Sequence, residues 1–110
     1  MSSYITERQC EQYRDWLRPG GCACSGPSCV GGLSFHHVER RGAIGSDPIL
    51  GGSDFAGFWL CWYHHRLEQD RLPAFEKELG MPVWRLIARN IFLFVVEKGL
   101  LETTDAGRSA

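Results

Sequence analysis

The sequence predicts an α+β fold with two short strands in its middle and helices at both ends. Two segments suit strands, because residues 33–38 alternate between two faces and residues 58–61 are apolar throughout. Four segments carry helical periodicity or helix-end residues, namely 4–17, 62–71, 73–80 and 83–99. A chain of 110 residues is typical of one domain, so we expect a single domain over residues 1–110.

The helix predicted over residues 4–17 has signals at both ends. Thr6 and Gln9 have the spacing of a capping box, and the Pro-Gly-Gly sequence that begins at Pro19 ends the helix. Its apolar face is formed by Ile5, Tyr13 and Leu17, with Trp16 beside them.

Two further helices are predicted over residues 73–99. The first begins at Pro73 and ends at Gly80, and the second begins after Pro82. The second is apolar nearly all round in its later half, which predicts burial against the core. The alternative is a homodimer contact through Ile91–Val96, because a small domain cannot cover every face. We expect residues 102–110 to form a flexible tail.

Composition excludes several classes of protein. The net charge is −1, with 12 basic and 13 acidic residues, which excludes a strongly basic nucleic-acid coat. Only Lys77 and Lys98 are lysines, and an arginine bias suits phosphate contact. The first residues lack the apolar segment of a secretory signal, and Ile91–Val96 is too short to span a membrane. We therefore expect a cytoplasmic protein without a membrane partner.

Cysteines and histidines are concentrated in one part of the chain. All four histidines and four of the five cysteines lie between residues 22 and 65. Thiols stay reduced in the cytoplasm, so this clustering predicts metal binding rather than disulfides. The preferred set for a structural zinc is Cys24, Cys29, Cys61 and His64. Cys22 leaves the first pair open, since C-x-C, C-x4-C and C-x6-C spacings are all available.

The histidines form two adjacent pairs, His36–His37 and His64–His65. Adjacent residues of a strand point to opposite faces, so His36 and His37 cannot do the same job. His36 and His65 can share a second metal that keeps an open coordination position. His37 is then a candidate general base, because the ordinary histidine pKa lies near neutrality. The competing interpretation of any one of these histidines is a core residue with satisfied hydrogen bonds.

Four sequence motifs together resemble the HNH, or ββα-metal, endonuclease family. They are C-x4-C, FHHVERRG, GGSDF and LCWYHHRLE, which fall within residues 22–70. In particular, the chain resembles the phage-type branch that includes the recombination-enhancing nuclease Ref. The resemblance implies a ββα-metal core over residues 22–70, flanking N- and C-terminal helices, and a bacterial cell with a phage or prophage origin.

The resemblance also implies roles for individual residues. His36 and His65 hold the catalytic metal, His37 is the general base, and Asp54 orients that base or fixes the loop. Cys61 and His64 join the upstream cysteines on the structural zinc. The residues expected to contact DNA phosphates are Arg40, Arg41 and Arg66, with Arg71 nearby.

The chain departs from the family at one metal position. Many relatives have a further histidine one helical turn after His65, where this chain has Gln69. Gln69 is a poor ligand for a transition metal, so the catalytic cation is expected to be Mg²⁺ or a transition metal completed by water, phosphate, Asp70 or Asp47.

The function predicted from these residues is metal-dependent hydrolysis of DNA phosphodiester bonds. The alternative is a non-catalytic module in which the zinc site supports binding to DNA or to another protein. The near-neutral charge and Gln69 favour the alternative, whereas the set of His36, His37 and His65 favours the nuclease. One metal per chain would indicate a structural role only.

Overall fold

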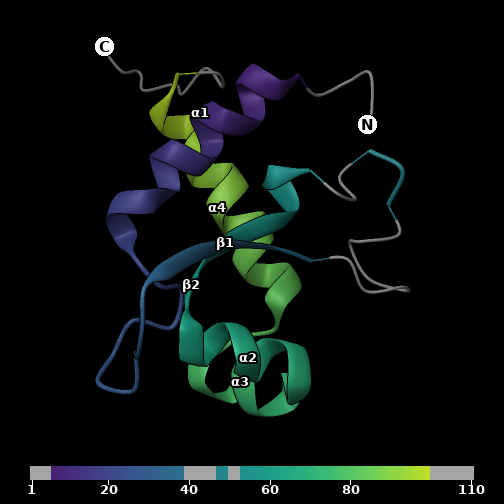
Figure 1. Ribbon diagram of the computed structural model, residues 1–110. Coiled ribbons are helices and arrows are strands. Elements are labelled where there is room, and N and C mark those ends of the chain that lie inside the picture. Colours follow the sequence, from purple (N-terminus) through teal and green to yellow (C-terminus); the bar gives the residue numbers. More distant parts are fainter. Residues whose placement is uncertain (1–5, 39–46, 50–52, 100–110) are drawn as a thin grey trace.

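The α+β class is confirmed by the computed structural model, which describes residues 6–38, 47–49 and 53–99 (Figure 1). Within these residues it forms four α-helices and a two-stranded antiparallel sheet. The elements in chain order are α1 (Glu7–Leu17), β1 (Leu33–His37), β2 (Gly57–Cys61), α2 (Trp62–Asp70), α3 (Leu72–Leu79) and α4 (Val83–Glu97).

The sheet and the helix that follows it are continuous in sequence. β1 and β2 pair so that Leu33 lies opposite Cys61 and His37 lies opposite Gly57. Gly57 has to be a glycine here, since a Cβ atom at this position would lie 2.5 Å from the carbonyl oxygen of His36. Cys61 ends β2 and caps α2, because its Sγ accepts a hydrogen bond from the backbone N–H of His64 at 3.4 Å. The connection between the sheet and α2 is therefore direct.

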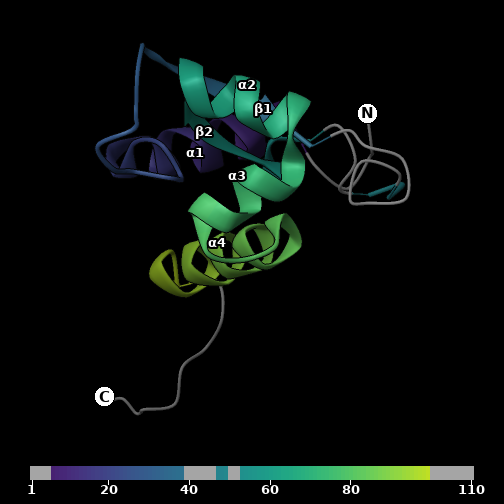
Figure 2. The same cartoon turned by 90° about the horizontal axis from the view of Figure 1, so that it is seen from below.

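The hydrophobic core lies between the sheet and helices α3 and α4. β2 is buried along its whole length, and Phe58 stacks on Phe75 of α3 with ring centroids 6.2 Å apart. Cys22, Cys24 and Cys61 belong to the same buried cluster. Figure 2 shows α3 between α2 on one side and α4 on the other. These cysteines are thus part of the core.

Helix α1 has the predicted capping box. The Thr6 N–H donates to Oε1 of Gln9 at 2.9 Å, and the Gln9 N–H donates to Oγ1 of Thr6 at 3.1 Å. Tyr13 is fully buried and stacks on Phe55, with ring centroids 4.5 Å apart. This contact packs α1 against the 3₁₀ helix Asp54–Ala56 that precedes β2.

The two C-terminal helices also follow the prediction. Gly80 ends α3 in the left-handed conformation, with φ of 85°. α4 packs against the core along one face, as predicted, while apolar residues on its other face are exposed. Its buried residues are Val83, Leu86, Ile87 and Phe94, whereas Trp84, Phe92 and Leu93 are exposed. The dimer contact through Ile91–Val96 stays a prediction.

Several predictions fall outside the described residues. They concern Ile5, Arg40, Arg41 and the tail at 102–110. Within the described ranges, no single helix has the length and apolar character needed to cross a membrane. Only α3 and α4 taken together meet those criteria, and they are bent by 46°.

Candidate metal centres and the histidine cluster

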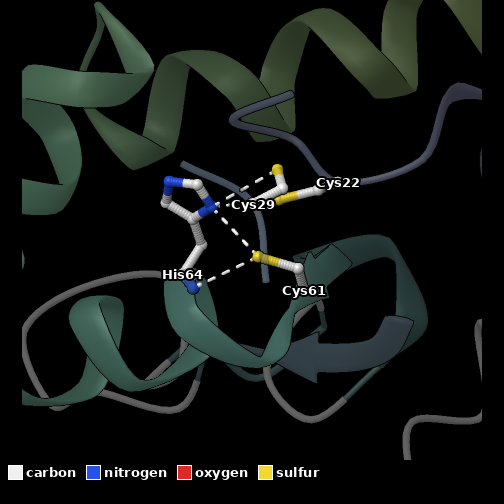
Figure 3. Close-up of side chains that lie close together, drawn as sticks. All are labelled: Cys22, Cys29, Cys61 and His64. Carbon is white, nitrogen blue, oxygen red and sulfur yellow. Dashed lines mark hydrogen bonds between the residues drawn. The ribbon is translucent and has the colours of Figure 1, made fainter. Parts of the chain in front are cut away.

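Four ligand atoms converge at the edge of the core (Figure 3). They belong to Cys22, Cys29, Cys61 and His64, and all lie within 4.8 Å of one another. Nδ1 of His64 lies 3.1 Å from the sulfur of Cys61, 3.5 Å from that of Cys22 and 3.7 Å from that of Cys29. Tetrahedral zinc with ordinary bond lengths places its nitrogen and sulfur ligands about 3.6 Å apart. The four residues therefore lie close enough to bind a metal ion such as zinc.

The loop that carries Cys22 and Cys29 is fastened to the sheet and α2. The Ala23 N–H donates to the carbonyl of Trp59 at 2.9 Å, and the Tyr63 N–H donates to the carbonyl of Val30 at 3.2 Å. Gly31 sits against the start of α2, where a Cβ atom would lie 2.6 Å from Cβ of Trp62. Backbone contacts at both ends of the loop thus bring its two cysteines to Cys61.

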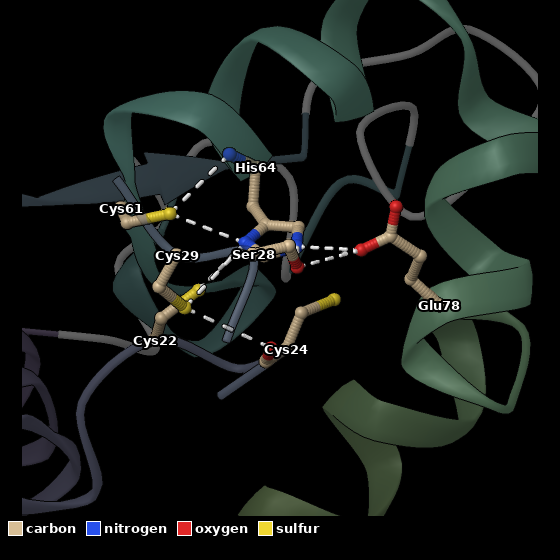
Figure 4. A network of polar contacts seen from close by, with 7 residues as sticks. All are labelled: Cys22, Cys24, Ser28, Cys29, Cys61, His64 and Glu78. Atoms are coloured by element: carbon tan, nitrogen blue, oxygen red, sulfur yellow. Dashed lines mark hydrogen bonds and ion pairs between the residues drawn. The ribbon is translucent and has the colours of Figure 1, made fainter. Parts of the chain in front are cut away.

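The prediction that Cys24 is a zinc ligand is corrected by this geometry, and Cys22 takes its place. The Ser25 N–H donates to the carbonyl of Cys22 at 3.0 Å, so Cys24 is a central residue of a tight turn. The Cys24 sulfur points away from the other three sulfur atoms (Figure 4). Its backbone carbonyl instead accepts from the thiol of Cys29 at 3.8 Å. Both the C-x4-C and the C-x6-C spacing are compatible with a metal site, and the turn around Cys24 is what distinguishes them.

The thiols of this cluster differ in acidity. Burial raises the pKa of Cys61, but hydrogen bonds from the backbone of His64 and Val30 and from the His64 side chain outweigh it and lower the pKa to about 6. Burial raises the pKa of Cys22 to about 11 and that of Cys24 to about 12. Cys61 is therefore more acidic than Cys22 and Cys24, and a bound metal would deprotonate the remaining thiols of the cluster.

His64 is oriented by a carboxylate that the sequence analysis missed. Nε2 of His64 lies 2.8 Å from Oε1 of Glu78, and Oγ of Ser28 lies 3.3 Å from the same nitrogen (Figure 4). The hydrogen bond to His64 lowers the pKa of Glu78. With a metal bound at the cluster, this carboxylate would hold the proton on Nε2, so that the Nδ1 lone pair would face the metal, as in many metal sites. No spacing signal marked Glu78, because it reaches the site from α3.

The assignment of Cys22 rather than Cys24 as a metal ligand predicts opposite results for two matched variants. Cys22→Ser is expected to lose the stoichiometric metal, since a hydroxyl is a poor substitute for a thiolate ligand. Cys24→Ser is expected to retain it. Zinc per chain, measured by mass spectrometry on protein expressed with zinc, decides the assignment. Full zinc in Cys22→Ser together with loss in Cys24→Ser would restore the original prediction.

A second group of polar side chains lies where β1 faces α2. Nδ1 of His36 is 3.2 Å from Nε2 of His65, and the sharing of a metal by these two residues stays a prediction. Two imidazole nitrogens on one ion, with bonds of about 2.1 Å at 90–110°, lie about 3.0–3.4 Å apart. Burial and the neighbouring His36 lower the pKa of His65, which favours its neutral ring.

Polar residues behind both rings set their orientation. Oγ of Ser34 lies 3.0 Å from Nδ1 of His65, and Oε1 of the fully buried Glu68 lies 2.9 Å from Nε2 of His36. The Glu68 carboxylate favours a proton on Nε2 of His36, so that Nδ1 of His36 carries a lone pair toward His65. Glu68 was missed because it was considered only as part of the helix. Among the described residues, only the Cys22–Cys29–Cys61–His64 cluster brings three or more ligand atoms together.

The other residues considered as helpers of this metal lie at the surface. Gln69 is exposed, and Asp70 pairs with Arg66 at 3.6 Å. Asp47 accepts a hydrogen bond from the backbone N–H of Ile49 at 2.8 Å. The guanidinium of Arg66 also lies 5.7 Å from the ring centroid of Trp62.

His37 lies in a separate polar chain. Its Nε2 is 2.5 Å from Oδ1 of Asp54, and Oδ2 of Asp54 is 2.6 Å from a guanidinium nitrogen of Arg14. Asp54 thus lies in contact with His37, and its role in orienting that residue stays a prediction. Arg14 was not singled out from the sequence, because it comes from α1, 40 residues before Asp54.

Comparison of the chain with protein-family models, with curated proteins and with solved structures finds no match to any of the three. The chain is therefore classified by its own fold and its candidate metal site. The chain is a small α+β protein in which three cysteines and one histidine can hold a metal ion such as zinc.

Proposed function

We propose that the protein is a metal-dependent endonuclease that hydrolyses DNA phosphodiester bonds. The observation that carries this proposal is a pair of facing imidazole nitrogens, on His36 and His65, next in sequence to a histidine hydrogen-bonded to a carboxylate. A pair of metal ligands and a carboxylate-oriented base are the two elements that metal-dependent hydrolysis of a phosphodiester requires.

His36 and His65 are the residues that would hold the catalytic cation. Their facing nitrogens have the separation expected of two ligands of one ion. A divalent cation bound there supplies charge stabilisation for the phosphate and for the leaving oxygen. Two protein ligands would leave coordination positions open for water and phosphate, which metal-dependent hydrolysis requires.

His37 would act as the general base. Asp54 accepts a hydrogen bond from the Nε2–H group of His37, so Nδ1 is the basic nitrogen of the neutral ring. The side chain of His37 is 35% exposed, which gives water access to it. His37 takes a proton from the attacking water, and Asp54 keeps the ring oriented while the charge develops.

The arrangement of the elements supports the ββα-metal interpretation suggested by the resemblance. β1 carries His36 and His37, β2 leads directly into α2, and α2 carries His65. The Cys/His cluster would anchor the junction of β2 and α2, because Cys61 and His64 precede His65 immediately. Arg66, with a side chain 62% exposed, is available to a DNA phosphate.

Nicking of supercoiled plasmid tests this proposal. Purified protein with Mg²⁺, Mn²⁺, Ni²⁺ or Zn²⁺ is expected to nick the plasmid, and EDTA is expected to stop the reaction. Binding to DNA should weaken as salt rises, because phosphate contacts release counterions. A folded, zinc-loaded protein that nicks with none of these cations would overturn the proposal.

The alternative is a non-catalytic zinc module that binds DNA or a protein. It is favoured by one observation, namely that the Cys/His cluster is the sole group of three or more close ligand atoms in the described part of the chain. Metal stoichiometry distinguishes the two. A second bound cation that His36→Ala removes supports the nuclease, and a single zinc unaffected by His36→Ala supports the module.

A further inference from the structure

Asp54 makes two strong polar contacts in different directions. Its Oδ1 meets Nε2 of His37 at 2.5 Å, and its Oδ2 meets the guanidinium of Arg14 at 2.6 Å. Asp54 itself is only 7% exposed. A buried carboxylate needs hydrogen-bonding partners to offset the loss of water, and a charged arginine is the strongest partner available. The two oxygens together set the rotation of the carboxylate.

Arg14 is held in place by the packing of α1. The Trp59 indole N–H donates to the carbonyl of Arg14 at 2.9 Å, which ties this turn of α1 to β2. The neighbouring Tyr13 stacks on Phe55, the residue after Asp54. The helix and the segment that carries Asp54 are therefore fastened to each other on both sides of the Arg14–Asp54 contact.

From this geometry we infer that Arg14 is a positioning residue for the general base. It acts through Asp54 and touches neither substrate nor cation. By occupying Oδ2, Arg14 leaves Oδ1 as the oxygen that faces His37, and this contact sets the plane of the imidazole ring. Helix α1, which lies outside the ββα segment, is in this way a working part of the site. The inference rests on the proposed nuclease function.

The first test compares Arg14→Gln and Arg14→Ala with Arg8→Gln, a control on the exposed surface of the same helix. We expect the Arg14 variants to lose about 10²-fold in kcat for nicking, with KM for DNA unchanged, because misplacing a catalytic group by about 1 Å costs that much. Added guanidinium should restore nicking to Arg14→Ala but not to His37→Ala. Wild-type kcat in Arg14→Gln would overturn the inference, as would loss of nicking that guanidinium fails to restore.

A second measurement does not depend on cleavage. In ¹⁵N-labelled protein, the Nε2 proton of His37 is expected to give a slowly exchanging, hydrogen-bonded signal that disappears in Asp54→Asn. The signal should also be lost in Arg14→Gln and retained in Arg8→Gln. Its persistence in Arg14→Gln would overturn the inference. Absence of nicking by wild-type protein that shows this whole NMR pattern would count against the nuclease and not against the role of Arg14.

Discussion

Replacement of His37 by alanine is expected to abolish plasmid nicking while the fold and the zinc content stay intact. A general base contributes about 10²–10⁴-fold to a reaction of this kind, which is enough to remove detectable nicking. The fold should survive, because the His37 side chain is 35% exposed and lies outside the Cys/His cluster. Initial rates of nicking, zinc per chain and the melting temperature give the three readouts.

Two controls make the His37 result specific. Lys77→Ala, on the exposed side of α3, should nick at the wild-type rate. Added imidazole should restore part of the activity of His37→Ala, since a small base can occupy the vacated space. Wild-type nicking by His37→Ala would exclude His37 as the base.

The second large effect is expected for Cys61→Ser, which should lose its metal and unfold or melt at a much lower temperature. Structural zinc contributes about 10–16 kcal/mol of apparent binding energy in small domains, as much as the whole stability of a typical protein. Cys61 also caps α2 through the His64 N–H, so the substitution weakens that helix start as well. Circular dichroism melts and zinc content, each with and without chelator, measure the effect.

Cys10→Ser is the matched control for Cys61→Ser. Cys10 is buried in α1 with 6% exposure and is not a member of the Cys/His cluster. The same thiol-to-hydroxyl change there should cost about 1–3 kcal/mol and leave the zinc content unchanged. An unchanged melting curve and full zinc in Cys61→Ser would contradict a structural metal at this cluster.

Much of the candidate site could be predicted because the relevant signals are local. Cys61 and His64 lie one turn apart at a helix start, and His36 and His37 alternate along a strand. The choice between Cys22 and Cys24 could not be predicted, because both spacings reach a metal and only the turn that contains Cys24 decides. Glu78 and Arg14 come from helices distant in sequence, where nothing local marks a charged residue on a helix as part of a site.

Local sequence signals are enough to predict the order of the helices and strands, the ends of α1 and α3, and the part of the chain in which the metal ligands lie. Capping boxes, left-handed glycines and strand alternation depend on neighbouring residues, so they can be read without the fold. Tertiary structure decided which cysteine completes the cluster, which face of α4 is buried, and which carboxylates hold the histidines. These choices depend on contacts between residues far apart in the chain. Arg14, brought to Asp54 by the packing of Tyr13 on Phe55, is the clearest case.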